Sequence, residues 1–241
     1  MPSPNFDGRT APPDIIVLHY TDMKSAASAV RWLTTAQSKV SAHYLIGADG
    51  DLFQMVAEED RAWHAGLSFW DGSEDVNARS IGIELDCPGH RPDAPTFPAV
   101  QIDALLDLLA TLRARWPVPR RNVVGHSDVA PSRKIDPGER FPWAKLVAEG
   151  HALEAIPVEP THETELTKTL AACGYGPAKD VATRAHLIKA FHRRHRPDAV
   201  TAPADAHTAA LAEGLAQAVA KERESELAAN ANFAFMRPRS T

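Results

Sequence analysis

Hydrophobic positions in the first half of the chain follow patterns that predict several β-strands. Residues 14–20 contain a continuous apolar stretch, 15–18, rich in β-branched side chains, which is typical of a central strand buried on both faces. Two shorter apolar segments, 41–46 and 51–56, are separated by Asp49-Gly50, a dipeptide that favours a hairpin. Residues 1–13 are rich in Pro and Ser, so we expect an extended arm there.

Residues 80–85 alternate in side-chain type, as expected for a strand with two different faces. Gly82 and Glu84 fall on one face, and the opposite face is entirely apolar: Ile81, Ile83 and Leu85. A lone glutamate on a strand usually faces solvent, but the neighbouring glycine leaves room beside it. We therefore expect Glu84 to face a cleft.

Helical periodicity alternates with these strands. Residues 97–116 place leucines three and four positions apart and stop at Pro117, which predicts an amphipathic helix that covers one face of the sheet. Residues 25–38 show similar spacing behind Ser25, a residue suited to an N-cap. Strands and helices that alternate in this way indicate an α/β arrangement.

The last third of the chain has only helical patterns, and it follows a Pro-containing linker over 156–160. Its apolar spacing predicts a small three-helix domain, with helices near 162–173, 181–195 and 205–228. The predicted organisation is a first domain over 1–155, a helical domain over 162–228 and a C-terminal tail over 229–241.

Composition and charge argue against several classes of protein. Hydrophobic residues make up 44% and charged residues 24% of the 241 positions, as in ordinary globular proteins. The net charge of −5 argues against a nucleic-acid partner, and we interpret the basic run 192–196 as a solvated helix end. No run of about 18 apolar residues predicts a membrane span. The N-terminus lacks the pattern of a secretory signal, so we expect a cytoplasmic location.

Three side chains with metal-ligand chemistry lie near the ends of predicted strands or in the loop that follows. His19 closes the run 14–20, His126 follows the apolar pair Val123-Val124, and Asp136 lies in the proline-containing loop after it. Two imidazoles and a carboxylate suit zinc, and three protein ligands leave a fourth position for water, as in catalytic zinc sites. The spacing alone is weak evidence, since a histidine in an ordinary surface turn would also fit His126.

A resemblance to a known family connects these residues. Over roughly residues 3–147 the chain resembles the zinc-dependent N-acetylmuramoyl-L-alanine amidases of the AmpD and AmiD kind, through five motifs in the same order. The motifs are Val-Leu-His-Tyr-Thr (17–21), Ser-Ala-His-Tyr-Leu-Ile (41–46), Ala-Trp-His-Ala-Gly (62–66), Asn-Ala-Arg-Ser-Ile-Gly-Ile-Glu-Leu (77–85) and Val-Gly-His-Ser-Asp-Val-Ala-Pro-Ser-Arg-Lys-Ile-Asp-Pro-Gly (124–138). The resemblance implies an α/β fold with a mixed β-sheet flanked by helices. It also implies hydrolysis of the amide bond between N-acetylmuramic acid, or its anhydro form, and L-alanine.

The resemblance also implies a role for each matching position. His19, His126 and Asp136 would bind one zinc ion. Glu84 would be the catalytic carboxylate, which takes a proton from water and returns it to the leaving amine. Lys134 would stabilise the negative charge that develops on the carbonyl oxygen.

Four further residues are candidates for contact with the substrate, which would be peptidoglycan or an anhydro-muropeptide: Trp63, His64, Asn77 and His43. Two of them have plausible structural roles as well. Trp63 could equally anchor its loop to the core, and His43 could support another site residue or serve in packing.

The C-terminal helices resemble, more loosely, a three-helix peptidoglycan-binding domain. The similar segments are Leu166 to Gly176, Ala190-Phe191-His192-Arg193 and Asp205-Ala206-His207-Thr208. His192 and Ala204-Asp205 depart from the Gln and the Asp-Gly turn that such domains commonly carry.

Two alternatives stay open at the level of the sequence. A wall-binding module would suit the periplasm instead of the cytoplasm. A non-catalytic protein that recognises peptidoglycan or muropeptides on the same scaffold is the alternative function, although the presence of Asp136 as a third ligand favours the enzyme. The sequence implies no particular oligomeric state.

Overall fold

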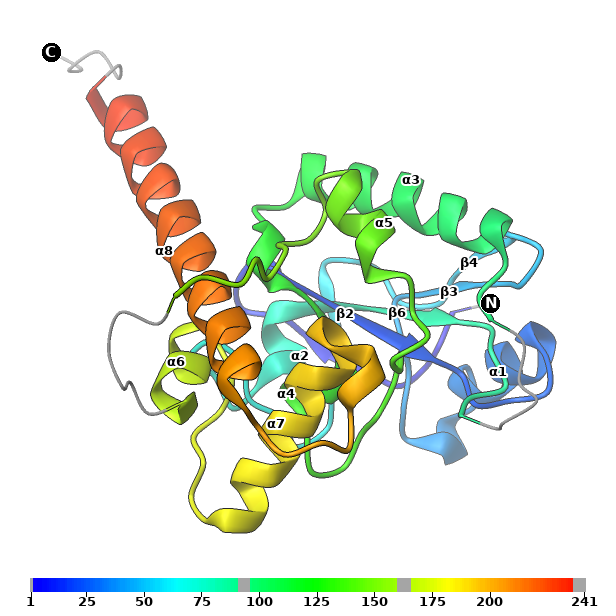
Figure 1. The fold of residues 1–241 in the computed structure, drawn as a ribbon. Helices are drawn as coiled ribbons and strands as arrows, with labels where there is room; N and C mark the ends of the chain where they lie inside the picture. The colour runs from blue at the N-terminus through cyan, green and yellow to red at the C-terminus, as the bar shows by residue number, and fades with distance from the viewer. Residues whose placement is uncertain (1, 91–95, 160–165, 236–241) are drawn as a thin grey trace, which may run out of the picture.

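The structure is a computed structural model, and it describes residues 2–90, 96–159 and 166–235. Its centre is a five-stranded sheet of order β4-β3-β6-β2-β7, in which only β4 runs antiparallel to its neighbour (Figure 1). This mixed sheet, flanked by helices, confirms the predicted fold class. Its strands are β2 (Ile15–Tyr20), β3 (Tyr44–Ile46), β4 (Leu52–Gln54), β6 (Ser80–Leu85) and β7 (Val123–Gly125).

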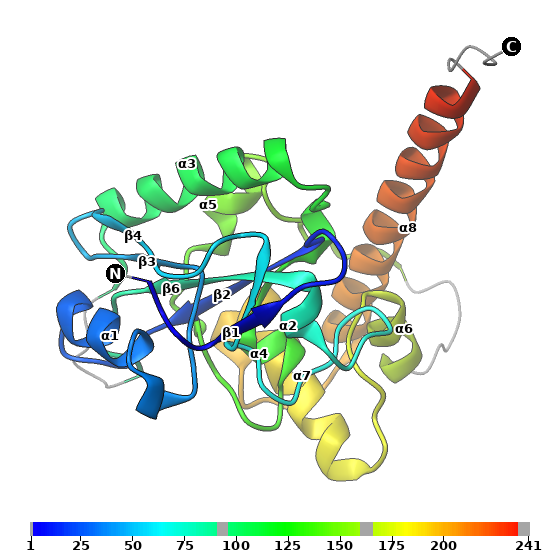
Figure 2. The same cartoon turned by 180° about the vertical axis from the view of Figure 1, so that it is seen from behind.

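A second sheet has two strands, β1 (Phe6–Gly8) and β5 (Asp60–Ala62), which pair antiparallel. The view from behind shows β1 in front of the main sheet (Figure 2). Ser3 is buried and donates its hydroxyl to the carbonyl of Leu33 at 2.6 Å. The described part of the predicted arm is therefore fixed to the body, because β1 and Ser3 have partners far along the chain.

The register of β2 determines which side chains meet at the carboxyl ends of the strands. β2 lies between β6 and β7 and runs parallel to both. His19 is paired with Glu84 on one side, and Leu18 is paired with Gly125 on the other. His126, which follows Gly125, therefore lies directly beside His19, although the two residues are far apart in the sequence.

One face of the sheet is covered by α3 (Ala99–Arg115) and α5 (Trp143–Ala148) (Figure 1). Four leucines of α3 pack against the apolar face of β6, as the alternation over 80–85 predicts. A shorter helix, α1 (Ala26–Leu33), begins at the predicted N-cap Ser25 and ends before a separate turn, η1 (Ala36–Ser38). The other short elements are α2 (Val76–Arg79), η2 (Arg120–Asn122) and α4 (His126–Val129).

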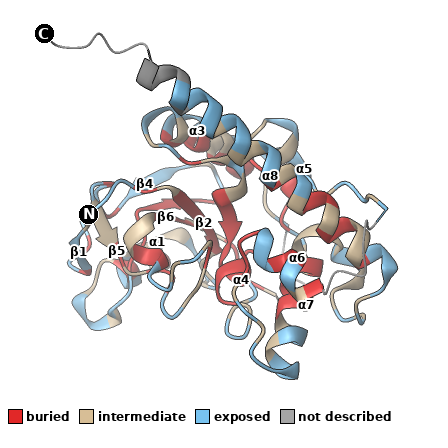
Figure 3. Ribbon diagram, turned by 90° about the vertical axis from the view of Figure 1, so that its left-hand side faces the viewer, coloured by how far each residue is buried: buried red, intermediate tan, exposed pale blue. Residues whose placement is uncertain are grey.

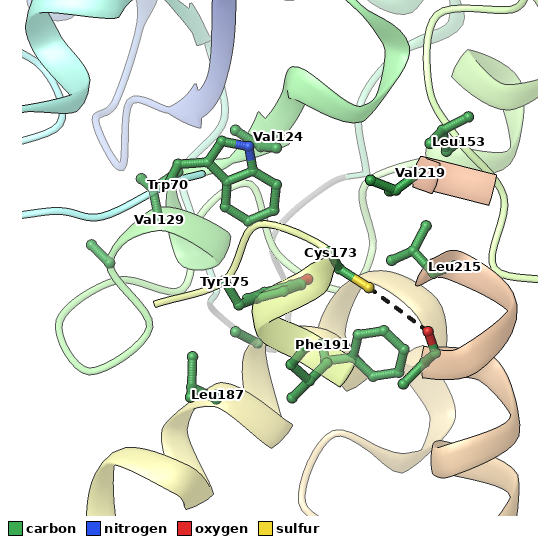
Figure 4. Close-up of a cluster of buried hydrophobic side chains, with 14 of the residues drawn as sticks. Trp70, Val124, Val129, Leu153, Cys173, Tyr175, Leu187, Phe191, Leu215 and Val219 are labelled. Atoms are coloured by element: carbon green, nitrogen blue, oxygen red, sulfur yellow. Dashed lines mark hydrogen bonds between the residues drawn. The ribbon is translucent and has the colours of Figure 1, made fainter. Parts of the chain in front are cut away.

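On the opposite side, the C-terminal helices share a core with β2, β7 and α4, whereas α1 packs against β3. The C-terminal helices are α6 (Leu166–Ala172), α7 (Val181–His195), η3 (Pro197–Ala199) and α8 (Ala206–Phe235). Side chains from both parts of the chain form one continuous core, which contains Val124 and Val129 together with Tyr175, Phe191 and Leu215 (Figure 4). The three predicted helices therefore share a core with the first part of the chain, while the predicted domain boundaries stay a prediction.

The predicted ends of two C-terminal elements need comment. Residues 162–165 of the first predicted helix, and 236–241 of the predicted tail, lie outside the described residues. The last helix, α8, continues to Phe235 and so takes in the beginning of the predicted tail 229–241. Its buried side chains lie between residues 208 and 219, and residues 220–229 are half-buried or exposed (Figure 3). No helix within the described residues is both long and apolar enough to span a membrane.

Arg194, in the basic run at the end of α7, is not solvated as predicted. Its side chain is only 6% exposed and donates to the carboxylate of Asp128 at 3.0 Å and to the carbonyl of Val123 at 3.1 Å. The guanidinium also lies 4.1 Å from the centre of the Trp143 ring. Asp128 accepts a further bond from the hydroxyl of Tyr175 at 2.9 Å. The prediction was wrong for Arg194 because the helix end faces the sheet.

Substitution of Arg194 by methionine should lower the free energy of unfolding by about 3 kcal/mol or more, because it leaves the buried carboxylate of Asp128 without its charged partner. Urea unfolding measures this difference. Arg184→Met is the matched control, since Arg184 is exposed on the same helix. Equal stability of the two variants would show that the buried ion pair adds nothing.

Candidate active site

The sequence-predicted residues converge on one cavity of about 390 Å³ at the carboxyl ends of β2, β6 and β7. Polar and apolar side chains from several loops share its wall. Seven of the nine predicted site residues line it: His19, Trp63, His64, Glu84, His126, Lys134 and Asp136. The other two, His43 and Asn77, do not.

Three potential metal ligands form a close triangle in this cavity. Nδ1 of His19 lies 2.9 Å from Nδ1 of His126 and 3.1 Å from Oδ2 of Asp136. The same carboxylate oxygen lies 3.0 Å from Nδ1 of His126. All three side chains are buried. One ion could bond all three atoms at the roughly 2.0–2.2 Å that zinc prefers.

A backbone partner sets the tautomer of His126. Its Nε2 lies 3.1 Å from the carbonyl oxygen of Ala65, which can only accept a hydrogen bond. Nε2 therefore carries the proton, and Nδ1 turns a lone pair towards the carboxylate of Asp136. An acceptor facing an anion at 3.0 Å requires a cation between them or near them, so this donor set fits a metal ion.

The protonation of the other two ligands also suits a metal. Burial, with a further contribution from His126, lowers the pKa of His19 to about 4, so this imidazole is neutral at pH 7. Burial raises the pKa of Asp136, but protonated His126 and His19 would outweigh this effect and hold the pKa below its usual range, and a metal cation at the same place would favour the ionised carboxylate in the same way. A neutral imidazole and an ionised carboxylate are the forms that bind zinc.

Glu84 and Lys134 supply a carboxylate and a cation beside the triangle. Burial, with a further contribution from the charge of Asp136, raises the pKa of Glu84 to about 8, although Lys134 opposes the rise. Among the described residues, Oε2 of Glu84 has no hydrogen-bond partner although it is covered from solvent. A covered, unpaired carboxylate oxygen is costly for stability, which is typical of a group kept for its chemistry.

Asn77 supports a loop instead of facing the cavity. Its side-chain oxygen accepts hydrogen bonds from the backbone N–H groups of His64 at 3.1 Å and Ala65 at 2.8 Å. The structure thus places this predicted substrate contact behind the loop. Trp63, in the same loop, does line the cavity and donates from its indole to Asp7 at 2.7 Å.

Comparison with known proteins identifies the family of the chain. A family model described as N-acetylmuramoyl-L-alanine amidase matches residues 9–139. The chain belongs to this family. The N-acetylmuramoyl-L-alanine amidase AmiD of Escherichia coli is 35% identical over 229 residues, which cover 83% of this chain and 81% of AmiD. The 1,6-anhydro-N-acetylmuramyl-L-alanine amidase AmpD of Enterobacter cloacae is 34% identical over 167 residues, 61% of this chain and 87% of AmpD.

Two solved structures of related proteins contain muropeptides. Escherichia coli AmiD, in complex with anhydro-N-acetylmuramic acid-L-Ala-D-γ-Glu-L-Lys, has a TM-score of 0.77 at 35% identity and covers 86% of this chain and 90% of its own. AmpDh3 of Pseudomonas aeruginosa, in complex with an anhydromuramic pentapeptide, has a TM-score of 0.79 at 33% identity and covers 86% and 92%. The likeness therefore extends well beyond residues 9–139.

In this amidase His43, like Asn77, lies behind the cavity. Its Nδ1 accepts a hydrogen bond from the backbone N–H of Gly82 at 2.9 Å, and its Nε2 lies 3.1 Å from the carbonyl oxygen of Asp60. His43 therefore connects β6 to the start of β5. Of the roles left open for it by the sequence, the geometry favours support.

The buried histidines of the amidase predict a loss of stability in acid. Burial lowers the pKa of His43 to about 3, well below its value of about 6.5 in an unfolded chain. The unfolded state therefore binds more protons below pH 6.5, and His43 alone should lower the unfolding free energy by about 1.4 kcal/mol for each pH unit. Unfolding of the metal-free protein between pH 7 and 4 measures the slope. His43→Gln should flatten it, whereas His207→Gln, at an exposed position, should not.

Trp32 is a cavity residue that sequence reasoning missed. It comes from α1, is 49% exposed and lines the same cavity as the triangle of ligands. A tryptophan outside the apolar stripe of an amphipathic helix was the available signal, because an exposed large aromatic side chain often marks a binding surface.

Proposed function

We propose that this amidase hydrolyses the amide bond between N-acetylmuramic acid, or its anhydro form, and the L-alanine of the stem peptide, with one zinc ion held by His19, His126 and Asp136. The observation that carries the proposal is the triangle of ligand atoms at 2.9–3.1 Å beside Glu84, in a cavity open to solvent. The substrates seen with AmiD and AmpDh3 support the choice of an anhydro-muropeptide.

The residues around the triangle account for the proton transfers of such a hydrolysis. A zinc ion held by His19, His126 and Asp136 would act as a Lewis acid: it would polarise the carbonyl group and make water more acidic. Glu84 accepts a proton as water attacks the carbonyl carbon, and it then delivers that proton to the nitrogen of L-alanine as the C–N bond breaks. The products are the lactyl carboxylate of the sugar and the free stem peptide.

Lys134 lies in the same loop as Asp136 and lines the cavity together with Glu84. Its ammonium group would stabilise the negative charge on the carbonyl oxygen, which is larger in the transition state than in the substrate. Because Lys134 lies outside the triangle, this role predicts an effect on turnover and little effect on metal binding.

Replacement of Lys134 by methionine should therefore lower kcat by about 100- to 1,000-fold, as the loss of one oxyanion donor does. Zinc affinity, measured by competition with a chromophoric chelator, should stay close to that of the wild type. Lys145→Met is the control, because Lys145 is exposed on α5. Arg133→Met is unsuitable, because Arg133 donates a hydrogen bond to the carbonyl of Ala65. Equal losses of affinity and turnover would contradict the role.

The proposed function is tested with purified, zinc-loaded protein and a defined anhydro-muropeptide. Mass spectrometry should detect the free stem peptide, and removal of zinc with a chelator should stop its release until zinc is added back. Tight binding of the intact muropeptide without any release would instead identify a recognition protein. Cleavage that survives complete removal of zinc would contradict the zinc-dependent mechanism.

A further inference from the structure

His64 lies in the cavity wall with both of its ring nitrogens paired inside the protein. Nδ1 is 3.1 Å from Nε2 of His19, and Nε2 is 3.1 Å from the hydroxyl of Ser80. The residue is 9% exposed. We propose that His64 is a positioning residue that fixes His19 in the tautomer required for metal binding. This inference rests on the proposed zinc-dependent function and assigns His64 a role other than the predicted contact with substrate.

The donor and acceptor in each of these hydrogen bonds follow from the last partner in the series, the carbonyl oxygen of Val76. The hydroxyl of Ser80 donates to the carbonyl oxygen of Val76 at 2.6 Å, and this oxygen can only accept. The lone pair of Ser80 Oγ is then free to accept the proton on Nε2 of His64. Nδ1 of His64 is left as an acceptor, so Nε2 of His19 must be the donor.

This direction leaves Nδ1 of His19 unprotonated. That nitrogen is the atom that lies 2.9 Å from Nδ1 of His126 and 3.1 Å from Asp136. The carbonyl of Ala65, next in sequence to His64, fixes the tautomer of His126 in the same way. Two neighbouring loop residues thus turn both histidine lone pairs towards one point, before any ion binds.

The surroundings of His64 are arranged to hold its ring in this place. A Cβ atom at Gly82 would lie 2.4 Å from the ring, so only glycine leaves space for it. Asn77 fixes the backbone by accepting from the N–H of His64. The sequence correctly indicates that Gly82 makes room beside Glu84, but the space is filled by an imidazole of the protein.

The loss of such a supporting residue typically costs 10- to 100-fold in metal affinity. His64→Leu removes the acceptor for His19 while keeping a side chain of similar bulk, and it should weaken zinc binding by about 10-fold or more. His64→Asn places an amide oxygen near the former Nδ1 and loses the reach to Ser80. Because the acceptor for His19 is kept, this variant should bind zinc within about threefold of the wild type.

Two measurements that need no turnover test the inference. Zinc dissociation constants are obtained by competition with a chromophoric chelator for the wild type and both variants. The tautomer of His19 is obtained from the long-range ¹⁵N–¹H spectrum of the metal-free wild type at pH 8, with assignment by the spectrum of His19→Gln. The spectrum should show a proton on Nε2 and none on Nδ1. Because it uses the wild type, it tests the inference even if His64→Leu does not fold.

The outcomes separate this inference from the proposed function. A wild type that does not bind zinc contradicts the proposed function itself. A wild type that binds zinc, with His64→Leu binding equally well, overturns the role of His64 alone. So does a metal-free wild type in which Nδ1 of His19 carries the proton. Weakened binding by His64→Leu, restored by His64→Asn, supports the positioning role and excludes a purely structural one.

Discussion

Asp136→Ala should lose zinc binding and amidase turnover together. Asp136 is the only carboxylate in the triangle of ligand atoms, and it alone brings negative charge to balance the ion. Without it, two neutral imidazoles remain and a second coordination position opens. The loss of zinc affinity should exceed the roughly 100-fold that is typical of losing a residue that only supports a ligand. Release of stem peptide should fall to background at any zinc concentration that does not precipitate.

A matched substitution distinguishes this effect from a general change of the cavity charge. Asp22 lines the same cavity outside the triangle, and its φ of 49° is a conformation that asparagine tolerates. Asp22→Asn should therefore keep zinc bound near the wild-type affinity. Chelator competition and mass spectrometry are run on both variants. If Asp136→Ala still binds zinc as tightly as Asp22→Asn, Asp136 is not a ligand.

Local patterns in the sequence were sufficient to predict the strands that build this site. The apolar run 14–20 and the alternation over 80–85 reflect contacts with adjacent layers, so they are visible without knowledge of the rest of the fold. The faces predicted for β6 are confirmed, with Ile81, Ile83 and Leu85 in the core below α3. The mixed sheet, in contrast, was predicted from the resemblance to the amidases.

The convergence of the ligands could not be read from spacing. His19 and His126 meet because β2 and β7 are parallel neighbours, and strand order is a property of the whole chain. The resemblance to the amidases, and not the spacing, predicted that these residues act together. The metal role of the triangle, the roles of Glu84 and Lys134, and the location of the protein in the cell stay predictions.

Polar residues near the site were harder to place than apolar ones. His43, His64 and Asn77 all lie in motifs of the resemblance, yet each pairs with groups of the protein itself: backbone groups, another imidazole or a serine hydroxyl. A sequence does not distinguish a polar side chain that faces a cavity from one that fixes the loop around it. Arg194 shows the same limit, because its burial depends on the distant carboxylate of Asp128.

Glu84→Gln should lower kcat by about 100- to 10,000-fold, the usual contribution of a general acid–base group, while zinc stays bound. Glutamine keeps the size of the side chain but can neither accept the proton of water nor return it to the leaving amine. Stem-peptide release under single-turnover conditions measures the loss, and chelator competition checks the metal. Turnover within about tenfold of the wild type would exclude Glu84 as the proton carrier.

The same substitution should stabilise the metal-free protein, which separates lost chemistry from damaged structure. Burial raises the folded-state pKa of Glu84 to about 8, against about 4.5 for an ordinary glutamate. Between these values the folded state binds more protons than the unfolded state, so Glu84 makes the wild type less stable as the pH rises through this window. Glu84→Gln removes that penalty. Its advantage in urea unfolding should therefore be greatest near pH 8 and shrink towards pH 4.5, and a variant less stable than the wild type at pH 8 would show that Glu84 is instead held by favourable contacts.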